Sequence, residues 1–445
     1  MDRTAPHALT TTVAPRAPRT PAETGLPFAF VAGLTLRHLL SGGEARQDEL
    51  AVRLRLPLSV IDPILAFLRA EKLAEVPRRG SFEADVTWAL TEAGRVRAQD
   101  ATARCGYVGP APVALDAYCA RVALQAQHGR HVDRARLRSG LGDAVVHDAL
   151  VDALGAALNS DRALFLYGPS GTGKTYIAER LGNVMHDAIL VPHAILVDGE
   201  VIQVFDPLVH RPMSETGPAD SLERAAPTDD RWVSVRRPVT AVGGELTLEM
   251  LELQFEAVSR FYVAPPQVKA NNGMLVIDDL GRQRVAAREL MNRWIVPLDR
   301  RVDHLALHTG GKFLLPFDVK VVFSSNLPPE SLGDPAFSRR VGYKLRLEAM
   351  DAPRYREVIR QACGRAGVPF DDAAAEHLIA GLHARHRVPL YPTIPFDVIG
   401  RLRDRADYLG EAPVLDPEGL DWAWSVYFSA DGSSGRAPTL RDETR

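Results

Sequence analysis

The chain is poor in cysteine and in long apolar runs. Its three cysteines, Cys105, Cys119 and Cys363, form no Cys-x-x-Cys pair, which argues against a disulfide framework and a zinc site and fits a reducing cytoplasm. No run of about 18 apolar residues could span a bilayer, and the N-terminus lacks the basic and then apolar order of a secretory signal. We therefore expect a cytoplasmic protein with no membrane span.

A charge imbalance is also missing. The net charge is -3 at pH 7, so the chain as a whole has no attraction to nucleic acid or anionic lipid, and any such binding must be local. Hydrophobic residues make up 46% and charged residues 24%, as in globular proteins, and the length suffices for about three domains. Residues 1–25 differ, because they are rich in Pro, Ala and Thr without an apolar period, and we predict a disordered tail there.

Residues 26–100 show a regular alternation of elements. Three segments with helical periodicity, 28–40, 46–54 and 59–73, precede two strand-like segments, 73–77 and 86–91. This order resembles a winged helix domain, with residues 78–85 as the wing.

Such a domain could bind either DNA or a protein surface. A duplex reader needs basic residues to displace counterions from phosphates. Here 10 Arg and Lys are balanced by 10 Asp and Glu, and only Arg78 and Arg79 in the wing suit a phosphate. DNA binding stays an alternative, and we favour a protein-protein or intramolecular role.

The strongest signal is "GPSGTGKT", which lies between an apolar strand at 163–167 and an amphipathic helix, the context of a P-loop. We assign ATP binding to Gly168, Pro169, Ser170, Gly171, Thr172, Gly173, Lys174 and Thr175. The glycines let backbone N–H groups cradle phosphates at a helix N-terminus. Lys174 is expected to reach the β and γ phosphates, and Thr175 to offer its hydroxyl to Mg²⁺.

A second apolar strand, 274–277, ends in two acids. We expect Asp278 to hold the metal through water and Asp279 to polarise the attacking water, as carboxylates do in phosphoryl transfer. Four apolar residues running directly into the pair argue against a solvated loop.

A third strand, "VVFSSN", ends in Asn326. The order of P-loop strand, acid-tipped strand and Asn-tipped strand resembles the AAA+ ATPases over about residues 162–428. The resemblance implies that Asn326 is sensor 1, on a strand between the other two, and that Arg339 or Arg340 is an arginine finger acting on the neighbouring subunit. It therefore implies a homo-oligomeric ring, for which a hexamer is one option.

The resemblance also implies the fold class, α/β, with a P-loop AAA+ core of parallel sheet flanked by helices, an α-helical lid and a preceding winged-helix (α+β) domain. We divide the chain into a disordered tail (1–25), a winged-helix-like domain (26–100), a helical linker (101–160), the ATPase core (161–347), the lid (348–430) and a flexible tail (431–445).

Two features depart from the family pattern. Asp279 stands where Glu is usual, and its shorter side chain predicts slow hydrolysis. The lid helices, which we place at 352–364, 371–386, 396–409 and 417–428, lack a sensor 2 Arg at the start of the third, where the nearest basic residue is Arg401.

The Gly-Gly pair in "HTGGK", residues 308–312, predicts a hairpin immediately before the third strand. Its position resembles the pre-sensor 1 hairpin of one AAA+ branch, and we expect His308 and Lys312 to contact a partner.

Two other segments carry no assigned function. Residues 206–244 look irregular, and "GGELTLEML", residues 243–251, is expected to start a new helix. The pair Arg236 and Arg237 could contact a partner or be solvated, and we favour the latter. "HARH" at 383–386 has a helical His spacing without further ligands, which indicates a surface-facing lid helix.

We predict an ATP-binding and ATP-hydrolysing remodelling motor that acts on an unidentified protein or nucleic-acid partner. The alternative is a nucleotide-switched regulator or scaffold with slow turnover, whose winged helix binds DNA or a protein. A motor needs Asp279, Asn326 and a finger, whereas a switch needs little more than the P-loop.

Overall fold

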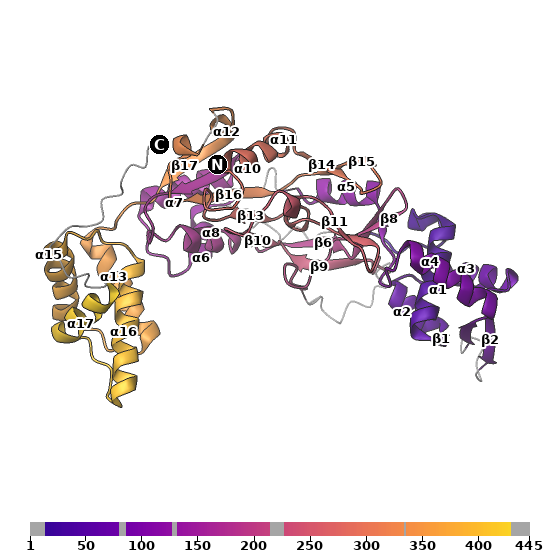
Figure 1. The fold of residues 1–445 in the computed structure, drawn as a ribbon, viewed down its shortest axis with the longest axis horizontal. Helices are drawn as coiled ribbons and strands as arrows, with labels where there is room; N and C mark the ends of the chain where they lie inside the picture. The colour runs from indigo at the N-terminus through magenta and orange to yellow at the C-terminus, as the bar shows by residue number, and fades with distance from the viewer. Residues whose placement is uncertain (1–13, 80–85, 127–130, 214–226, 333–334, 429–445) are drawn as a thin grey trace, which may run out of the picture.

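The computed structural model describes residues 14–79, 86–126, 131–213, 227–332 and 335–428. Figure 1 shows an elongated molecule, with the N-terminal helices α1 to α4 at one end and the C-terminal helices α13 to α17 at the other. Two main sheets and their flanking helices lie between these ends. Within the described ranges, no helix is long and apolar enough to cross a membrane.

The N-terminal part has the three helices and two strands that the sequence predicts. They are α1 (Phe28–Gly42), α2 (Gln47–Leu54), α3 (Leu58–Ala70), β2 (Ala74–Arg79) and β3 (Val86–Leu90). A short β1 (Ala45–Arg46) pairs with β3, giving an antiparallel sheet in the order β1-β3-β2. The helix α4 (Glu92–Arg104) packs against α1. Most of the expected wing, residues 80–85, lies outside the described residues.

Residues 14–25 are folded, so the predicted disordered tail is wrong for this stretch. The backbone N–H of Ala17 donates to the carbonyl of Pro227 at 2.9 Å, and a short 3-10 turn (Ala22–Thr24) follows. The carbonyl of Thr24 accepts from the Arg231 guanidinium at 2.9 Å. These partners are about 200 residues away, so local periodicity gives no sign of them. Residues 1–13 and 429–445, including the predicted C-terminal tail, lie outside the described residues.

A second sheet, in the order β11-β12-β8-β7-β4, lies between the N-terminal part and the core. Its strands are β4 (Val113–Ala114), β7 (Ala194–Val197), β8 (Glu200–Gln203), β11 (Gln254–Glu256) and β12 (Phe261–Val263). The elements that share its apolar core are α5 (Leu115–Leu124), α9 (Pro266–Lys269), and the strand pair β6 (Ala188–Pro192) and β9 (Trp232–Arg236). The sequence did not predict this unit, because its strands are very short and widely separated.

The predicted hairpin is confirmed. Strand β14 (Val302–Ala306) pairs antiparallel with β15 (Lys312–Pro316), and Gly310 adopts φ 91° in the turn. Leu305, Leu307 and Leu315 enter the core of the second sheet, so the hairpin is docked on that sheet.

The core is a five-stranded parallel sheet in the order β10-β13-β16-β5-β17. Its strands are β5 (Ala163–Tyr167), β10 (Val239–Val242), β13 (Met274–Ile277), β16 (Lys320–Ser325) and β17 (Val341–Arg346). Leu164 and Leu166 enter an apolar core on one face and Phe165 enters another on the opposite face, as in a parallel sheet covered on both sides. The α/β P-loop fold is thereby confirmed, with the Asn-tipped β16 between β13 and β5 as expected.

Helices cover both faces of this sheet. One face carries α6 (Arg134–Leu141), α7 (Asp148–Leu158) and α8 (Lys174–Gly182), and the other carries α10 (Ala287–Arg293), α11 (Ile295–Arg300) and α12 (Pro335–Arg340). Short 3-10 turns occur at Glu249–Leu251 and Pro329–Ser331.

Two predicted boundaries are therefore wrong. Residues 101–160 are not a linker, because α5 belongs to the second sheet and α6 and α7 belong to the core. The region 206–244 contains β9 and the core strand β10, and the helix predicted after Gly244 is only a 3-10 turn. Strands of four or five residues beside Pro and Arg are too short for a clear period.

The C-terminal part is helical, as predicted. It contains α13 (Ala352–Ala366), α14 (Asp372–Glu376), a π-helical stretch (His377–His383), α15 (Ala384–His386), α16 (Thr393–Leu409) and α17 (Pro417–Tyr427). The predicted second helix is thus interrupted by a π segment.

The expectation that "HARH" faces the surface is wrong for His383. It is buried, and its ring nitrogens are hydrogen-bonded to the Tyr355 hydroxyl at 2.6 Å and the Val388 carbonyl at 2.9 Å. It therefore belongs to the core of the C-terminal part.

A buried polar network lies at the amino ends of three core strands. Arg237 precedes β10, Asn272 precedes β13 and Asp318 precedes β16. The Arg237 side chain is 1% exposed, and its Nε donates to Asp187 Oδ2 at 2.8 Å. Its other nitrogens donate to the carbonyls of Gln125 and Asn272. The prediction that Arg237 is solvated was wrong, because neighbouring residues of an extended chain point to opposite sides and this one points inward.

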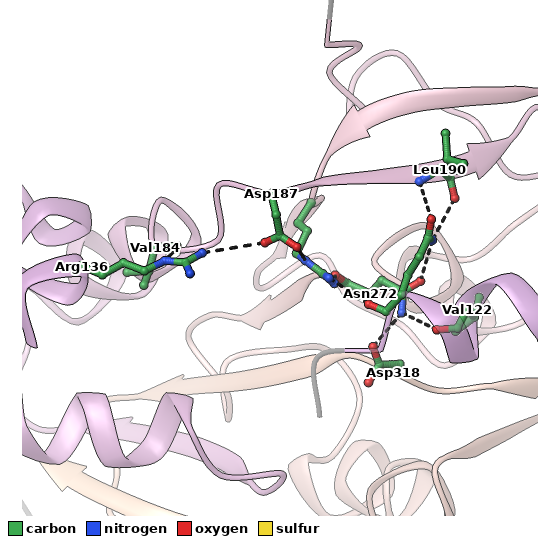
Figure 2. Close-up of polar contacts among 9 residues, drawn as sticks. Val122, Arg136, Val184, Asp187, Leu190, Asn272 and Asp318 are labelled. Atoms are coloured by element: carbon green, nitrogen blue, oxygen red, sulfur yellow. Dashed lines mark hydrogen bonds and ion pairs between the residues drawn. The ribbon is translucent and has the colours of Figure 1, made fainter. Parts of the chain in front are cut away.

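The side-chain amides of Asn272 and Gln125 extend the network to elements that pack against the second sheet. Asn272 Nδ2 donates to Asp318 Oδ2 at 2.7 Å and to the Val122 carbonyl at 2.9 Å, as Figure 2 shows. Gln125 accepts from the Leu190 N–H at 2.7 Å and donates to its carbonyl at 3.1 Å. Val122 lies on α5, Gln125 caps that helix and Leu190 lies on β6, so the network joins elements that pack against the second sheet to the core.

Replacing Arg237 by Met should destabilise the protein, because Asp187 would lose its buried partner, a change that costs about 3–5 kcal/mol. Arg236→Met is the matched control, since the bonds of Arg236 to His186 and Asn183 are exposed, and surface changes stay within about 0.5 kcal/mol. Urea denaturation followed by tryptophan fluorescence measures both variants. Equal shifts of the midpoint would contradict the assigned role.

Candidate functional site

The P-loop joins β5 to α8 in a conformation that depends on glycine. Gly168, Gly171 and Gly173 have φ values of 144°, 84° and 84°, where side chains are rarely tolerated. A Cβ added at Gly168 would lie 2.1 Å from the Leu347 carbonyl oxygen, and one at Gly171 would lie 2.6 Å from Thr393 Oγ1. The loop leads into the N-terminus of α8, where unpaired N–H groups favour an anion.

Lys174 is buried inside this loop. Its Nζ donates to the carbonyls of Gly168 and Pro169 at 2.9 Å each. Burial lowers the pKa of Lys174, and the nearby carboxylates of Asp279 and Asp278 oppose that shift. The amino group is therefore held between the loop and the two acids.

Polar side chains that follow β13 and β16 lie beside the loop at the carboxyl edge of the sheet. Thr175 Oγ1 donates to Asp278 Oδ2 at 2.7 Å, and Asn326 Nδ2 donates to Asp279 Oδ1 at 3.3 Å. Asp279 itself has φ 50°, a left-handed backbone that costs about 1–3 kcal/mol and is concentrated at functional sites. The structure thus brings together Lys174, Thr175, Asp278, Asp279 and Asn326, the polar residues that the sequence singled out.

A hollow of about 720 Å³, the first hollow, opens beside these groups. Its lining comes from residues 167–170, 279–282 and 325–328 and from Arg346. Sequence reasoning missed two cations here, Arg282 and Arg346. Arg282 comes three residues after Asp279 and Arg346 ends β17, and no local pattern marks either as part of a site.

The two finger candidates lie on α12 and do not line the first hollow. Arg340 Nε forms an ion pair with Asp299 Oδ2 at 2.6 Å. Arg339 is exposed, and its carbonyl accepts from the Arg162 guanidinium at 3.4 Å. The two residues are therefore not equivalent.

A second hollow, of about 160 Å³, lies at the other end of the P-loop, between the core and the C-terminal part. Thr172, Gly173 and Tyr176 line it from the core, and Arg365 and Phe396 line it from α13 and α16. Arg365 lies 4.8 Å from the centre of the Phe396 ring. No local pattern marks Arg365 or Phe396, because they meet Tyr176 only through the tertiary fold.

Asp143 joins the C-terminal part to the core beside the second hollow. It accepts from the Tyr176 hydroxyl at 2.7 Å and from Arg365 at 2.7 Å, and it pairs with Arg180 at 2.6 Å. The hydrogen bond from Tyr176, followed by that from Arg365, holds the pKa of the Asp143 carboxyl below its usual range.

The start of α16 also touches the P-loop, but without a basic residue. Thr393 Oγ1 donates to the Gly171 carbonyl at 3.2 Å. Arg401 is directed elsewhere, because it donates to the Asp397 carbonyl at 2.6 Å and lies 4.9 Å from the Tyr427 ring. No cluster of three or more His, Cys, Asp or Glu that could hold a metal occurs in the part of the chain that the structure describes.

Comparisons with known proteins give partial matches. Residues 351–426 match a family model described as a domain of unknown function (DUF8689). No curated protein matches the chain. Among solved structures, NtrX from Brucella abortus in complex with ADP is 16% identical, with a TM-score of 0.39, over 69% of this chain and 59% of that chain.

A second solved structure is the Thermotoga maritima RuvB Holliday junction branch migration motor, which is 16% identical with a TM-score of 0.33, over 66% of this chain and 70% of that chain. The chain spans 56% of the length of another NtrX structure.

Asp143→Asn should weaken the contact between the C-terminal part and the core, because an amide carries no charge to pair with Arg180 and Arg365. We expect faster hydrogen exchange in residues 142–147 and in the P-loop. Asp372→Asn is the control, since Asp372 pairs with Arg356 inside the C-terminal part and forms no ion pair with the core among the residues that the structure describes. Unchanged exchange in the Asp143 variant would contradict the assignment.

Lowering the pH should also weaken the contact between the C-terminal part and the core, because it protonates the Asp143 carboxylate. Because the pKa of Asp143 is lowered, its contribution is present above the ordinary value of 3.8 and is lost as the pH falls through the lowered value.

Proposed function

We propose that the protein binds ATP and hydrolyses it to ADP and phosphate. The observation that carries this proposal is the pair of contacts Thr175–Asp278 and Asn326–Asp279 at the mouth of a glycine-built loop. They lie at the carboxyl ends of parallel strands, where α/β sheets bind their ligands. The first hollow would hold the phosphates and the second hollow the base, against Phe396.

The donor set at the loop fits Mg²⁺. This ion takes hydroxyl, carboxylate and phosphate oxygens and keeps several waters. Thr175 Oγ1 and the Asp278 carboxylate lie 2.7 Å apart at the end of the loop, so both are in reach of one ion. We assign Thr175 as a direct ligand and Asp278 as a ligand through water. A bound ion would neutralise charge on the β and γ phosphates.

The remaining roles follow from the same geometry. Lys174 would contact the β and γ phosphates from inside the loop. Asn326 holds one oxygen of Asp279, which leaves the other oxygen to accept a hydrogen bond from the attacking water. The short Asp279 side chain fits slow turnover.

Two substitutions separate binding from hydrolysis. Lys174→Ala should abolish binding of a fluorescent ATP analogue, whereas Asp279→Asn should retain binding and lose turnover by about 10²-fold or more. Lys344→Ala is the control, because Lys344 contacts Ser338 and does not line either hollow. Parent-rate hydrolysis by Asp279→Asn would show that the base is misassigned.

We also propose that the site is completed by a neighbouring copy, as the resemblance to AAA+ ATPases implies. Arg339 is the better finger candidate, because it is exposed while Arg340 is paired with Asp299. The finger would then come from α12 of the adjacent subunit in a homo-oligomer.

Mixing tests this assembly. Arg339→Ala and Lys174→Ala proteins should each be inactive, and their mixture should regain part of the ATPase rate at shared interfaces. The Arg339→Ala, Arg340→Ala double variant should behave like Arg339→Ala alone. No recovery at any ratio, with light scattering showing monomers in ATP, would rule out a finger in trans.

For the action of the ATPase, we propose a remodelling motor with a winged-helix module at its N-terminus. The three helices and the β1-β3-β2 sheet support the module, and the sheet order of the core supports an AAA+ motor. The client would be a protein or a nucleic acid.

The contacts of His308 at the hairpin tip favour the alternative, a nucleotide-switched regulator. The hairpin tip is held by the second sheet, because the His308 ring lies 4.1 Å from that of Phe255 and the His308 N–H donates to the Tyr262 hydroxyl at 2.9 Å. Only Lys312 of the two expected contact residues is left exposed without such a docking contact. The hairpin would then relay nucleotide state to the second sheet instead of touching a client.

A further inference from the structure

A groove of about 590 Å³ lies in the N-terminal part, between α1, the end of α3 and α4. Leu36 and Leu68 form part of its buried floor. Phe28 and Phe67 stand at its edge, 39% and 40% exposed, with their rings 5.1 Å apart and nearly perpendicular. Exposed aromatic rings beside a hollow leave apolar surface in water, which is characteristic of interaction sites.

A buried arginine lines the same groove with an unsatisfied donor. Arg37 is 4% exposed, one of its terminal nitrogens donates to the Cys105 carbonyl, and its guanidinium lies 5.7 Å from the Phe30 ring. Its Nε has no hydrogen-bond partner among the described residues. The positive charge of Arg37 thus lies under the groove, where it favours an anionic group of a bound molecule.

The wall formed by α4 is basic. Arg97, Ala101 and Arg104 are spaced i, i+4, i+7 and therefore lie on one face of the helix. Both arginines are exposed and form no ion pair with another described residue. Two acids, Asp100 and Glu71, also line the groove, so its three arginines leave it with a positive excess.

The length of the groove fits a short helix. It follows α1 from Phe28 to Arg37 and α4 from Arg97 to Arg104, which is about 10 to 14 Å at 1.5 Å per residue. This length corresponds to about two turns of a bound helix, whose i and i+4 side chains would be the anchors.

We propose that this groove binds an amphipathic helix of a protein partner, with aromatic or aliphatic anchors packed against Phe28 and Phe67 and with Asp or Glu facing α4. A carboxylate there would meet Arg97 and Arg104 at the rim, above the buried positive charge of Arg37. The proposal names the partner class of the ATPase proposed above and rests on that function only for the existence of a partner.

The same observations disfavour a nucleic acid. Phosphates need accessible cations, whereas the floor here is apolar and one of the three arginines is buried. The exposed residues of α3 include Asp62, and residues 26–100 are balanced in charge.

A display library of 16-residue helical peptides, randomised at eight positions, tests the proposal on the full-length protein without nucleotide. Enriched peptides should carry Phe, Trp or Leu at i and i+4 with Asp or Glu beside them. Fluorescence anisotropy should show affinities about 10-fold weaker or worse with Phe67→Glu, because hot-spot truncations commonly cost more than this factor. The double variant Arg97→Glu, Arg104→Glu should turn the preference toward Lys-bearing peptides.

Val52→Glu is the matched control, since Val52 is 66% exposed on α2 and does not line the groove. It should bind the peptides with the parent affinity. Circular dichroism of each variant shows whether it folds, and Arg37→Met provides a groove variant without added charge that should also weaken binding.

Three results would overturn the proposal. They are no enriched peptide, enriched peptides that bind Phe67→Glu as tightly as the parent, and a duplex DNA probe whose binding alone depends on Arg97 and Arg104. ATP binding measured on the same proteins keeps the two proposals apart, because loss of nucleotide binding with intact peptide binding contradicts only the ATPase.

Discussion

The buried ion pair between Arg237 and Asp187 is the centre of a polar network that joins the core sheet to elements packed against the second sheet. Arg237 is almost fully buried, so its charge must be met inside the protein, and Asp187 and two carbonyls meet it. An uncompensated charge at this depth would cost several kcal/mol, which makes the arrangement of α5, β6 and the starts of β10, β13 and β16 interdependent. The network fixes the amino ends of β13 and β16, whose carboxyl ends carry the two acids and Asn326.

That connection matters because the site is built from the ends of separate strands. The P-loop follows β5, the acids follow β13 and Asn326 follows β16, and their contacts of 2.7 and 3.3 Å require the strands to keep one register. A parallel sheet buried on both faces supplies this rigidity. Within the site, left-handed backbone occurs in the loops that follow the strands, at the P-loop glycines and at Asp279. Packing of the sheet thus offsets the cost of holding the acid in a left-handed conformation.

The second sheet gives the molecule a physical path from the site to its N-terminal part. Ala194, Leu196 and Val201, from β7 and β8, pack into the same apolar core as α1 to α4. On its other side the sheet holds the hairpin through His308, and the hairpin leads directly into β16 and Asn326. Packed elements therefore connect β16 to the groove between α1 and α4, so a displacement of β16 could shift the walls of that groove. This arrangement would connect the proposed nucleotide site with the proposed partner groove.

The sequence by itself determined the P-loop, the acid and Asn tips of the next strands, the hairpin turn and most helices, because each depends on local chemistry. Glycines at three loop positions, four apolar residues before Asp278 and the 3.6-residue period of the helices are visible without a fold. Only the tertiary structure decided what joins distant residues. The inward turn of Arg237, the docking of residues 14–25, the second sheet, and the meeting of Asp143, Tyr176 and Arg365 all rest on contacts across long stretches of chain. Such contacts leave no period in the sequence, because their partners are selected by packing and by the need to pair buried polar groups.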